Sequence, residues 1–570
     1  MIVGIDLGTT NSLIGVWRNG SAELVPNALG AVLTPSVVSL DRSGDILVGA
    51  AARERLTSHP ALTAAAFKRY MGTPRKISLG EQNFRAEELA SFVIRSLRAD
   101  AEAYLEQPIE EAIITVPAYF SDAQRRATRM AGELAGLKVE RLLNEPTAAA
   151  LAYGLSGAGA DGSVLVFDLG GGTFDVSVLE MNDGVLEVRA TAGDNFLGGE
   201  DFDDAIAAWF LLETGMQAPD PLDPNPHTLM LTARLKREAE AARRRLGSEA
   251  SATMTLQKTD ASTAQAVLTA DTFARLSEPL LERLRRPITR ALADSRIRPE
   301  QLAHVVLAGG ATRMPIIRRE AARLFGRLPL QRLDPDEVVG RGAAVQAGLK
   351  MRSAALDDIV LTDVAPYTLG IAVVEMGRDG AVSGRMLPVI ERNTVVPVSR
   401  VRDVSPARDF QRQVSVNIFQ GESRLVKDNI ALGSFELNLT ARRIADQSID
   451  VRFTYDVNGI LEVSAKAADG ASERIVIRHG PDAPQPELAE ARLAALVALK
   501  IHPREAAANR LLLARAERLF EELLGPSRKA MGSAIDAFDA ALQAQDPDAI
   551  ELAGLALAAA LTHAESGIKP

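Results

Sequence analysis

The chain has 570 residues, of which 47% are hydrophobic and 24% are charged, and its formal net charge is −10. A chain of this length and composition is expected to be globular and to form several domains. The acidic balance argues against nucleic acid as a general partner. A chain without cysteine has no disulfide and no cysteine-ligated zinc ion, and it suits a reducing cytoplasm.

The N-terminal residues predict a strand that begins at once, without a basic region followed by an apolar one, so no signal peptide is expected. The longest apolar stretch, near residues 552–561, is short and rich in alanine. That composition favours a packed helix over a membrane span. The sequence therefore predicts a cytoplasmic protein that does not bind membranes.

One glycine-rich turn occurs twice, each time after a run of strand-forming residues. Residues 4–11 read Gly-Ile-Asp-Leu-Gly-Thr-Thr-Asn, and residues 167–175 read Phe-Asp-Leu-Gly-Gly-Gly-Thr-Phe-Asp. Alternating residues follow each turn, which predicts a β-hairpin with a glycine-rich tip. Backbone N–H groups in such a tip bind anions, and an aspartate at the strand end can hold a metal ion beside a phosphate. Two such tips facing each other would clamp a nucleotide from both sides. The sequence has no P-loop pattern, so a P-loop nucleotide site is not expected.

Strand and helix signals alternate from residue 1 to about residue 355, which is typical of an α/β domain. A strand is predicted at residues 112–116, and Ser121 is the predicted N-cap of the next helix. A third glycine turn, residues 307–313, lies between a strand and a helix and is either a helix start or part of a ligand cradle. Glu145 precedes a proline-started helix, where it is either a partner of the helix dipole or a metal- or water-binding carboxylate.

The pattern changes at residues 357–363, where an apolar triplet lies between acidic residues. Period-two alternation follows, for example at residues 449–457 before the turn dipeptide Asn458-Gly459, and it predicts an all-β domain. After the proline-rich stretch 480–486, the chain is rich in alanine, leucine, glutamate and arginine, and a helical bundle is expected.

These motifs resemble those of the seventy-kilodalton heat-shock protein chaperones of the DnaK type. The matching segments are residues 4–11, 116–122, 144–154, 167–175, 195–203, 309–315, 342–346, 369–371 and 420–422. The length of the chain and its residues 57–60 and 67–69 look most like the bacterial HscC branch. The resemblance implies a multidomain chain with an α/β actin-like ATPase domain of two lobes at 1–355, an apolar linker at 356–363, a β-sandwich peptide-binding domain at 364–480 and a short α-helical lid at 487–570.

The resemblance also implies an ATP-dependent molecular chaperone, in which ATP hydrolysis controls the binding and release of extended apolar segments of unfolded proteins. ATP or ADP would bind with Mg²⁺, and K⁺ is a further candidate ion. A J-domain co-chaperone is an implied partner. The loop around Gln257 to Val267 looks short, which does not support dependence on a nucleotide-exchange factor. The alternative is a structural polymer or a sugar kinase on the same actin-like core, which would not need the β-rich domain.

Individual positions receive roles by the same resemblance. Lys68, a surface lysine on local pattern alone, would position the attacking water, and the catalytic set is completed by Glu145, Asp168 and Thr173. Asp6 and Asp168 would hold Mg²⁺ through water. The positions implied to contact nucleotide are Thr9, Thr10, Asn11, Gly170, Gly171, Gly172, Glu240, Arg243, Arg244, Gly309, Gly310, Arg313 and Asp336. The implied allosteric relay consists of Pro117, Arg125, Ile359, Val360 and Leu361, and the implied peptide groove of Ile371, Val374, Ala407, Val414 and Val416.

Some positions depart from the family pattern. Arg243 stands where the family usually has lysine, and Gly247 stands where serine is usual. On pattern alone, the basic helix at residues 234–245 is a solvated face with Glu–Arg pairs at i,i+4. Val374 and Ala407 occupy the two positions that arch over a bound peptide, and their small side chains predict a weaker arch than methionine would form.

Overall fold

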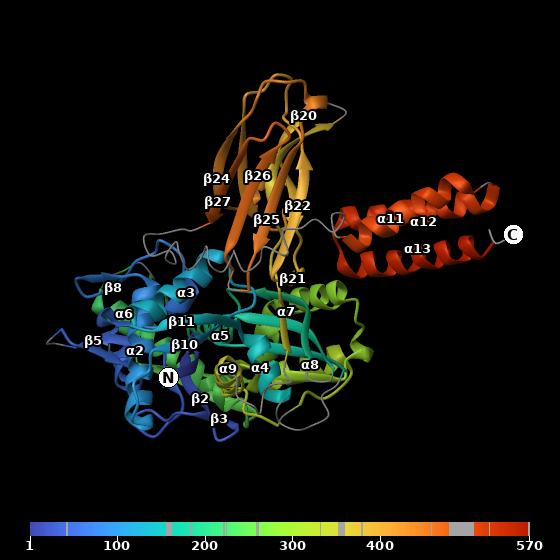
Figure 1. Ribbon diagram of the computed structural model, residues 1–570. Coiled ribbons are helices and arrows are strands. Elements are labelled where there is room, and N and C mark those ends of the chain that lie inside the picture. The colour runs from blue at the N-terminus through green and yellow to red at the C-terminus, as the bar shows by residue number, and fades with distance from the viewer. Residues whose placement is uncertain are drawn as a thin grey trace. The chain divides into compact units, whose positions relative to one another are not determined.

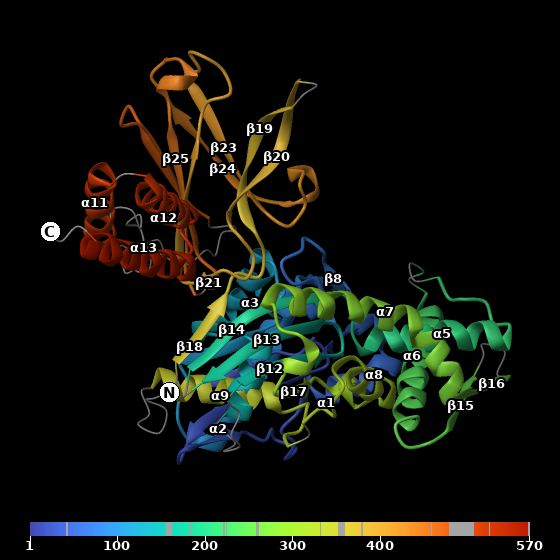
Figure 2. The ribbon, with the colours of Figure 1, turned by 90° about the vertical axis from the view of Figure 1, so that its right-hand side faces the viewer.

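The computed structural model describes the chain except for residues 42–43, 155–161, 183–184, 221–222, 224, 258–261, 331, 352–359, 378–379, 458, 478–506, 524 and 568–570. It divides into two compact units (Figures 1 and 2). Unit 1 consists of Met1–Tyr367 with Arg392–Val395, and unit 2 consists of Thr368–Glu391 with Val396–Pro570. The predictions for Ile359, Asn458, the stretch 480–486 and the start of the helical region lie outside the described residues.

The first lobe of unit 1 is built on a sheet with the strand order β11-β10-β1-β2-β3. The first glycine turn joins β1 (Ile2–Asp6) to β2 (Asn11–Arg18) in an antiparallel hairpin. β3 (Ser21–Leu24) pairs with β2, while β10 (Glu111–Val116) runs parallel to β1 and β11 (Lys138–Asn144) parallel to β10. The predicted hairpin and the predicted strand at 112–116 are both confirmed.

The second lobe repeats this arrangement around the second glycine turn. β12 (Gly162–Leu169) and β13 (Phe174–Asn182) form an antiparallel hairpin, and β14 (Val185–Asp194) pairs with β13. β17 (His304–Ala308) runs parallel to β12, as β10 runs parallel to β1. The duplication therefore extends from the turn to the surrounding sheet, and the two aspartates lie at equivalent strand ends.

Two helices pack between the sheets. α4 (Glu145–Gly154) and α9 (Val338–Lys350) share one apolar core with residues from both sheets, including Ile113 of the first lobe and Val166 of the second (Figure 1). The helices approach so closely that a Cβ on Gly342 would lie 1.8 Å from the carbonyl oxygen of Ala148. This shared core joins the lobes beneath the two turns.

The other elements of unit 1 complete the two lobes. Ser121 caps the helix after β10 by accepting a hydrogen bond from the backbone N–H of Gln124, as predicted. The elements are β4 (Thr34–Pro35), β5 (Val38–Leu40), β6 (Ile46–Val48), α1 (Ala50–Ser58), β7 (Thr63–Ala64), β8 (Ile77–Leu79), β9 (Gln82–Phe84), α2 (Ala86–Leu105), α3 (Asp122–Leu134), α5 (Gly199–Thr214), α6 (Pro226–Arg245), β15 (Ser251–Gln257), β16 (Thr263–Thr269), α7 (Ala270–Ser295) and α8 (Pro315–Phe325).

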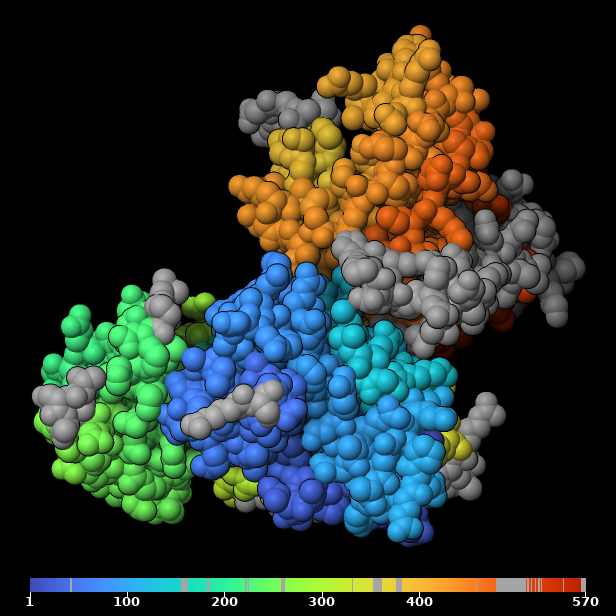
Figure 3. Space-filling view, turned by 90° about the vertical axis from the view of Figure 1, so that its left-hand side faces the viewer, coloured from blue at the N-terminus to red at the C-terminus, as the bar shows by residue number. Residues whose placement is uncertain are grey.

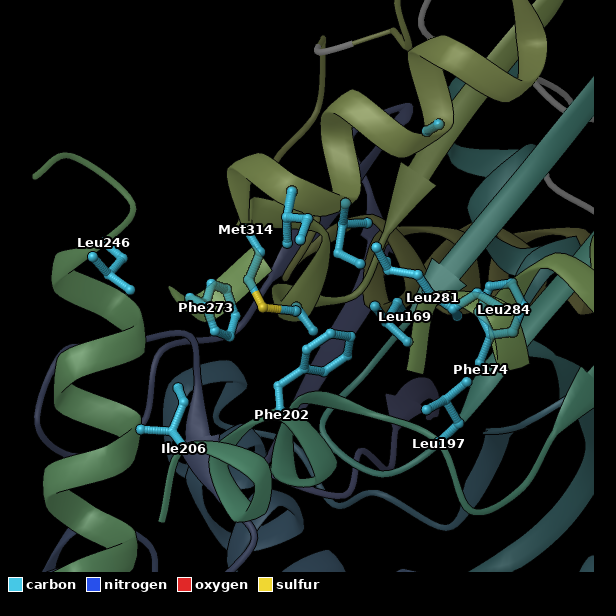
Figure 4. Close-up of a cluster of buried hydrophobic side chains, with 14 of the residues drawn as sticks. Leu169, Phe174, Leu197, Phe202, Ile206, Leu246, Phe273, Leu281, Leu284 and Met314 are labelled. Carbon is cyan, nitrogen blue, oxygen red and sulfur yellow. The ribbon is translucent and has the colours of Figure 1, made fainter. Parts of the chain in front are cut away.

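The core of the second lobe anchors the second glycine turn. Leu169 and Phe174, which flank the turn, are both 0% exposed and belong to a cluster that also contains Phe202 of α5 and Met314 (Figure 4). Burying such side chains stabilises the fold by about 1.5–3 kcal/mol each. The turn is therefore held at both ends by well-packed strands.

Unit 2 begins with two four-stranded antiparallel sheets that form the expected β-sandwich. One sheet has the order β20-β19-β23-β24 and the other β22-β25-β26-β27. Alternate residues of each sheet are buried, for example Val416 and Ile418 in one and Val451 and Phe453 in the other. The strands are β19 (Leu369–Gly377), β20 (Gly380–Ile390), β22 (Val398–Val404), β23 (Gln413–Gln420), β24 (Ile430–Asn438), β25 (Ile449–Tyr455), β26 (Leu461–Ala467) and β27 (Ser472–Ile477).

The C-terminal region is helical, as its composition predicts. α11 (Ala507–Glu522), α12 (Gly525–Ala544) and α13 (Pro547–Gly567) share a core that includes Phe538 and Leu557. Within the apolar stretch near residues 552–561, Leu557 and Leu561 are buried in this core, so the predicted packed helix is confirmed. Among the described helices, none combines the length and apolar character needed to cross a membrane.

Candidate functional site

The tips of the two glycine turns meet in unit 1. A Cβ on Gly171 would lie 2.0 Å from the Thr10 hydroxyl oxygen, and a Cβ on Gly172 would lie 2.8 Å from the methyl group of Thr9. The carbonyls of Gly170 and Gly171 accept hydrogen bonds of 2.9 Å from the first N–H groups of α5. A side chain at Gly171 or Gly172 would require the neighbouring side chains to shift. The structure thus brings the predicted phosphate-binding residues of both turns together.

Two buried aspartates lie at the bases of the turns. Asp6 accepts a 2.8 Å hydrogen bond from the hydroxyl of Thr115, while one carboxylate oxygen of Asp168 is buried without a hydrogen-bond partner. Burial, followed by repulsion from Glu145, raises the pKa of Asp6 to about 7 and the pKa of Asp168 well above its usual value. Buried carboxylates with an unsatisfied oxygen fit a divalent cation such as Mg²⁺.

These two carboxylates do not form a complete protein cage. Within the described residues, no three His, Asp or Glu side chains are grouped closely enough to ligate a metal ion by themselves. Mg²⁺ usually keeps several waters and is bound through one or two carboxylates together with substrate phosphates. The donor set therefore fits a Mg²⁺ ion that arrives with a nucleotide.

Lys68 forms a buried ion pair with Glu145. Lys68 belongs to a 3-10 helix, Phe67–Tyr70, and is 3% exposed; Glu145 is the first residue of α4 and is 7% exposed. The ammonium nitrogen lies 2.6 Å from a carboxylate oxygen of Glu145 and 5.7 Å from the centre of the Phe120 ring. The interpretation of Lys68 as a surface lysine is therefore wrong, and a fixed positive charge lies near the aspartates of both turns.

The third glycine turn lies beside Asp168. Gly309 has a φ of 80°, and a Cβ there would lie 2.3 Å from the carbonyl oxygen of Leu169 and 2.7 Å from an Asp168 oxygen. A Cβ on Gly310 would lie 2.4 Å from an oxygen of Asp336, which also accepts a 2.9 Å hydrogen bond from Arg313. This turn therefore joins the other two, which favours the ligand cradle over an ordinary helix start.

The basic helix α6 is partly paired with acidic residues. Arg244 and Glu240 form the expected i,i+4 pair at 2.6 Å, and Glu240 also lies 3.8 Å from Arg53 of α1 in the first lobe. Figure 3 shows N-terminal segments (blue) directly against segments of the second lobe (green). Arg243 makes a bidentate contact with Asp203 of α5, at 2.6 and 3.1 Å. Burial nevertheless raises the pKa of Asp203 to about 6.

Arg69 and Asp175 also belong to this site, although the motifs assign them no role. Arg69 donates a 3.2 Å hydrogen bond to the carbonyl of Gly172 and pairs with Asp201 of α5, so it links the first lobe to the second turn. Asp175 accepts a 2.9 Å hydrogen bond from the N–H of Tyr119, which lies in the first lobe. The sequence offered one signal for each residue: Arg69 directly follows Lys68, and Asp175 ends the second copy of the repeated motif.

Comparisons with known proteins identify the family. A family model described as Hsp70 protein matches residues 2–508. The chain is 42% identical over 488 residues to "Chaperone protein DnaK" of Thermosipho melanesiensis, which covers 84% of this chain and 80% of that relative. It is 41% identical over 489 residues to the protein of the same name from Thermotoga neapolitana, with the same coverage. The chain belongs to the Hsp70 family.

Membership of the Hsp70 family settles the class of activity. Hsp70 proteins are ATP-hydrolysing molecular chaperones, and they bind nucleotide, generally with Mg²⁺. The chain is accordingly an ATP-dependent molecular chaperone and an ATPase. The alternative of a structural polymer or a sugar kinase is not favoured, because the matched region extends through the β-sandwich.

In this Hsp70 chain, the apolar linker residues that the structure describes form a strand. β18 (Val360–Val364) runs parallel to β14, with Leu361 opposite Leu186. Leu361 is half-buried and packs against the core shared by the two lobes. The described part of the linker is thus part of the second-lobe sheet.

A chain of side-chain hydrogen bonds leads from this strand to the start of α4. Asp363 accepts bonds of 2.8 and 2.7 Å from the amide of Asn144, which precedes Glu145. Asn144 in turn accepts a 2.6 Å bond from Arg125, and Arg125 also donates a 3.0 Å bond to the carbonyl of Ala118, next to the buried Pro117. The structure therefore connects two of the expected relay residues, Pro117 and Arg125, to the linker.

Tyr119 contacts several distant segments of unit 1, and the sequence analysis assigned it no role. Its carbonyl accepts bonds of 2.8 Å from Asn195 and 2.7 Å from the hydroxyl of Tyr367, and the rings of the two tyrosines lie 4.4 Å apart. Its own hydroxyl accepts a 3.1 Å bond from Arg290. Tyr119 lies in the motif segment 116–122, but nothing in the local sequence indicates contacts with residues so far along the chain.

The expected peptide-groove residues lie where two strands of the sandwich separate. β19 and β23 pair only as far as Ile371 opposite Ile418, whereas β19 stays paired with β20 and β23 with β24 to their ends (Figure 2). Ile371 and Val416 are each 3% exposed, and Val414 is half-buried. Val374 and Ala407 are exposed. The diverging edges leave backbone groups of both strands available to an added chain.

Proposed function

We propose that ATP binds between the two glycine turns of a nucleotide-binding domain formed by residues 1–355. The observation that carries this proposal is the contact between the tips of the turns, directly above two buried aspartates. Thr9, Thr10 and Asn11 would bind phosphate from one side, and Gly170 to Thr173 from the other. The third turn, with Arg313 and Asp336, and the α6 residues Glu240, Arg243 and Arg244 would surround the adenosine.

Catalysis at this site would rest on positioning and electrostatics. Bound Mg²⁺ would neutralise phosphate charge, held through water by Asp6 and Asp168, with K⁺ as a further candidate ion. Lys68, fixed by its 2.6 Å contact with Glu145, would orient the attacking water and offset charge that develops on the transferred phosphoryl group. Thr173, which is 5% exposed, would contact the same phosphate from the second turn.

Binding of Mg²⁺ and ATP should release protons near pH 7. Because burial raises the pKa values of Asp6 and Asp175 to about 7, these carboxyls are partly protonated at neutral pH, and a nearby cation favours their charged form. Affinity for Mg²⁺-ATP should therefore rise between pH 6 and pH 8. Calorimetry in two buffers with different ionisation enthalpies measures the release, which should shrink in Asp6→Asn. A heat of binding that is identical in both buffers at pH 7 would contradict this prediction.

Hydrolysis would be coupled to the β-sandwich through the linker, residues 356–363. The start of α4 is connected to β18 through Arg125, Asn144 and Asp363. A change in the angle between the lobes would therefore alter how Leu361 packs beside β14. A strand that can be added to or released from a sheet edge is a two-state element. Ile359 and Val360 would belong to the same element.

The sandwich, residues 364–480, would bind extended client segments by adding a strand between β19 and β23. Ile371, Val414 and Val416 would form the apolar pocket, with Val374 and Ala407 at its rim.

We further propose that the protein works with a J-domain partner and does not depend on a nucleotide-exchange factor. Residues 487–570 would form a lid. The protein would be cytoplasmic and would belong to the HscC branch.

The proposed function is tested by single-turnover hydrolysis with and without an apolar peptide. Wild-type protein should hydrolyse bound ATP slowly, and faster when the peptide is present. The Lys68→Ala variant should hydrolyse ATP far more slowly than the wild type, both with and without the peptide. Absence of any hydrolysis by the wild type would overturn the proposed nucleotide site, and hydrolysis that no peptide changes would overturn the proposed coupling.

A further inference from the structure

Phe410 is an exposed aromatic residue in an unusual backbone conformation. It lies in the loop of residues 405–412, which connects β22 to β23, and it is 61% exposed with a φ of 59°. Residues with a Cβ rarely adopt this left-handed region, and bulky side chains do so least often. Backbone strain of this kind tends to persist where it serves a function.

The other non-glycine residues with positive φ in the described chain have simpler settings. Asn19 and Asn393 are asparagines, for which the region is common. Glu106, Arg296 and Gln545 each follow the last residue of a helix. Ala66 precedes the 3-10 helix that contains Lys68. Phe410 shares none of these settings.

The loop holds Phe410 in a defined place. Four hydrogen bonds fix it: Phe410 N–H to the Arg442 carbonyl at 2.7 Å, Ile444 N–H to the Asp409 carboxylate at 2.8 Å, Ala407 N–H to the Gln411 side-chain oxygen at 3.0 Å, and the Gln411 amide to the Gln413 carbonyl at 2.6 Å. The backbone of such a loop loses little freedom when a ligand contacts it.

The loop leads directly into the free edge of the proposed groove. Gln413 begins β23, and residues 413–417 pair with β24 but not with β19. On the opposite flank, Val374 of β19 is 47% exposed. In the loop before β23, Ala407 has only a methyl group, whereas Phe410, three residues later, carries an exposed aromatic ring.

We propose that Phe410, rather than Ala407, supplies the apolar contact on the β23 flank of the groove. It would select client segments that carry an aromatic or large aliphatic side chain next to the residue held in the pocket. Aromatic pairs contribute affinity beyond the area they bury. This inference rests on the proposed peptide-binding function of the groove and adds the class of segment that the groove prefers.

The test compares two fluorescent heptapeptides with the same central leucine, flanked by phenylalanine or by alanine. Fluorescence anisotropy with ADP-bound protein should show that the wild type prefers the phenylalanine-flanked peptide by about fivefold. Phe410→Asn should bind both peptides equally. Asparagine tolerates positive φ and keeps the backbone hydrogen bonds of the loop, so the melting temperature should not fall. Phe410→Tyr should keep the preference.

Ile430→Asn is the matched control. Ile430 is 49% exposed and begins β24, where it pairs with Gln420 at the opposite end of β23 from Phe410. Its replacement should leave the preference unchanged. A wild type that binds neither peptide overturns the proposed groove. A wild type that binds both equally, or a preference that survives in Phe410→Asn, overturns the role of Phe410 and leaves the groove standing.

Discussion

Lys68→Ala should reduce the single-turnover rate of ATP hydrolysis by about 10²–10³-fold or more, which is the usual effect of removing one preorganised electrostatic group. The lysine is 3% exposed and is held 2.6 Å from Glu145, so its charge stays in one place near the aspartates of both turns. Quenched-flow measurement on preformed enzyme–ATP complex isolates this step from nucleotide binding. Lys76→Ala, at an exposed lysine on the next loop, should hydrolyse ATP at the wild-type rate.

The same substitution also affects stability, and the two effects can be separated. Removing Lys68 leaves Glu145 buried without its partner, which typically costs about 3–5 kcal/mol and should lower the melting temperature of the nucleotide-free protein. Lys68→Ala combined with Glu145→Gln removes both charges and should recover much of that stability, while hydrolysis stays lost. If Lys68→Ala hydrolyses ATP at the wild-type rate, the assignment of Lys68 is wrong.

The repeated turn was predictable because its information is local. Strand-forming residues at 164–167, an aspartate at the strand end and a glycine tip follow one another directly, and they specify a hairpin without reference to the rest of the chain. The all-β character of the sandwich was predictable for the same reason, since alternation appears within single strands. That two such hairpins would face each other was a hypothesis, which the contact of Thr10 with Gly171 now supports.

Partners that lie far apart in the chain were not predictable from one sequence. Asn144 and Asp363 are 219 residues apart, and neither position has a periodicity that points to the other. Arg243 on α6 pairs with Asp203 on α5, a choice determined by how two helices pack. The pairing of Val360 and Leu361 as a strand beside β14 depends on an open sheet edge that exists only after the second lobe has folded.

Leu361→Asp should leave the basal ATPase rate near that of the wild type and abolish its stimulation by peptide. Leu361 pairs with Leu186 and packs against the core shared by the lobes, so a charged side chain there opposes docking of β18. A penalty of about 2.8 kcal/mol is enough to shift the ratio of docked to released linker by about 100-fold. Steady-state hydrolysis measured across a range of peptide concentrations distinguishes lost stimulation from weakened peptide binding.

Val185→Asp provides the matched control, because Val185 is on the partner strand in register with Val360 but is 41% exposed. A charge there stays in water and should leave stimulation intact. Peptide affinity of the ADP-bound Leu361→Asp protein should equal that of the wild type, since the substitution lies outside the sandwich. If peptide still accelerates hydrolysis in Leu361→Asp, then docking of β18 is not the coupling step.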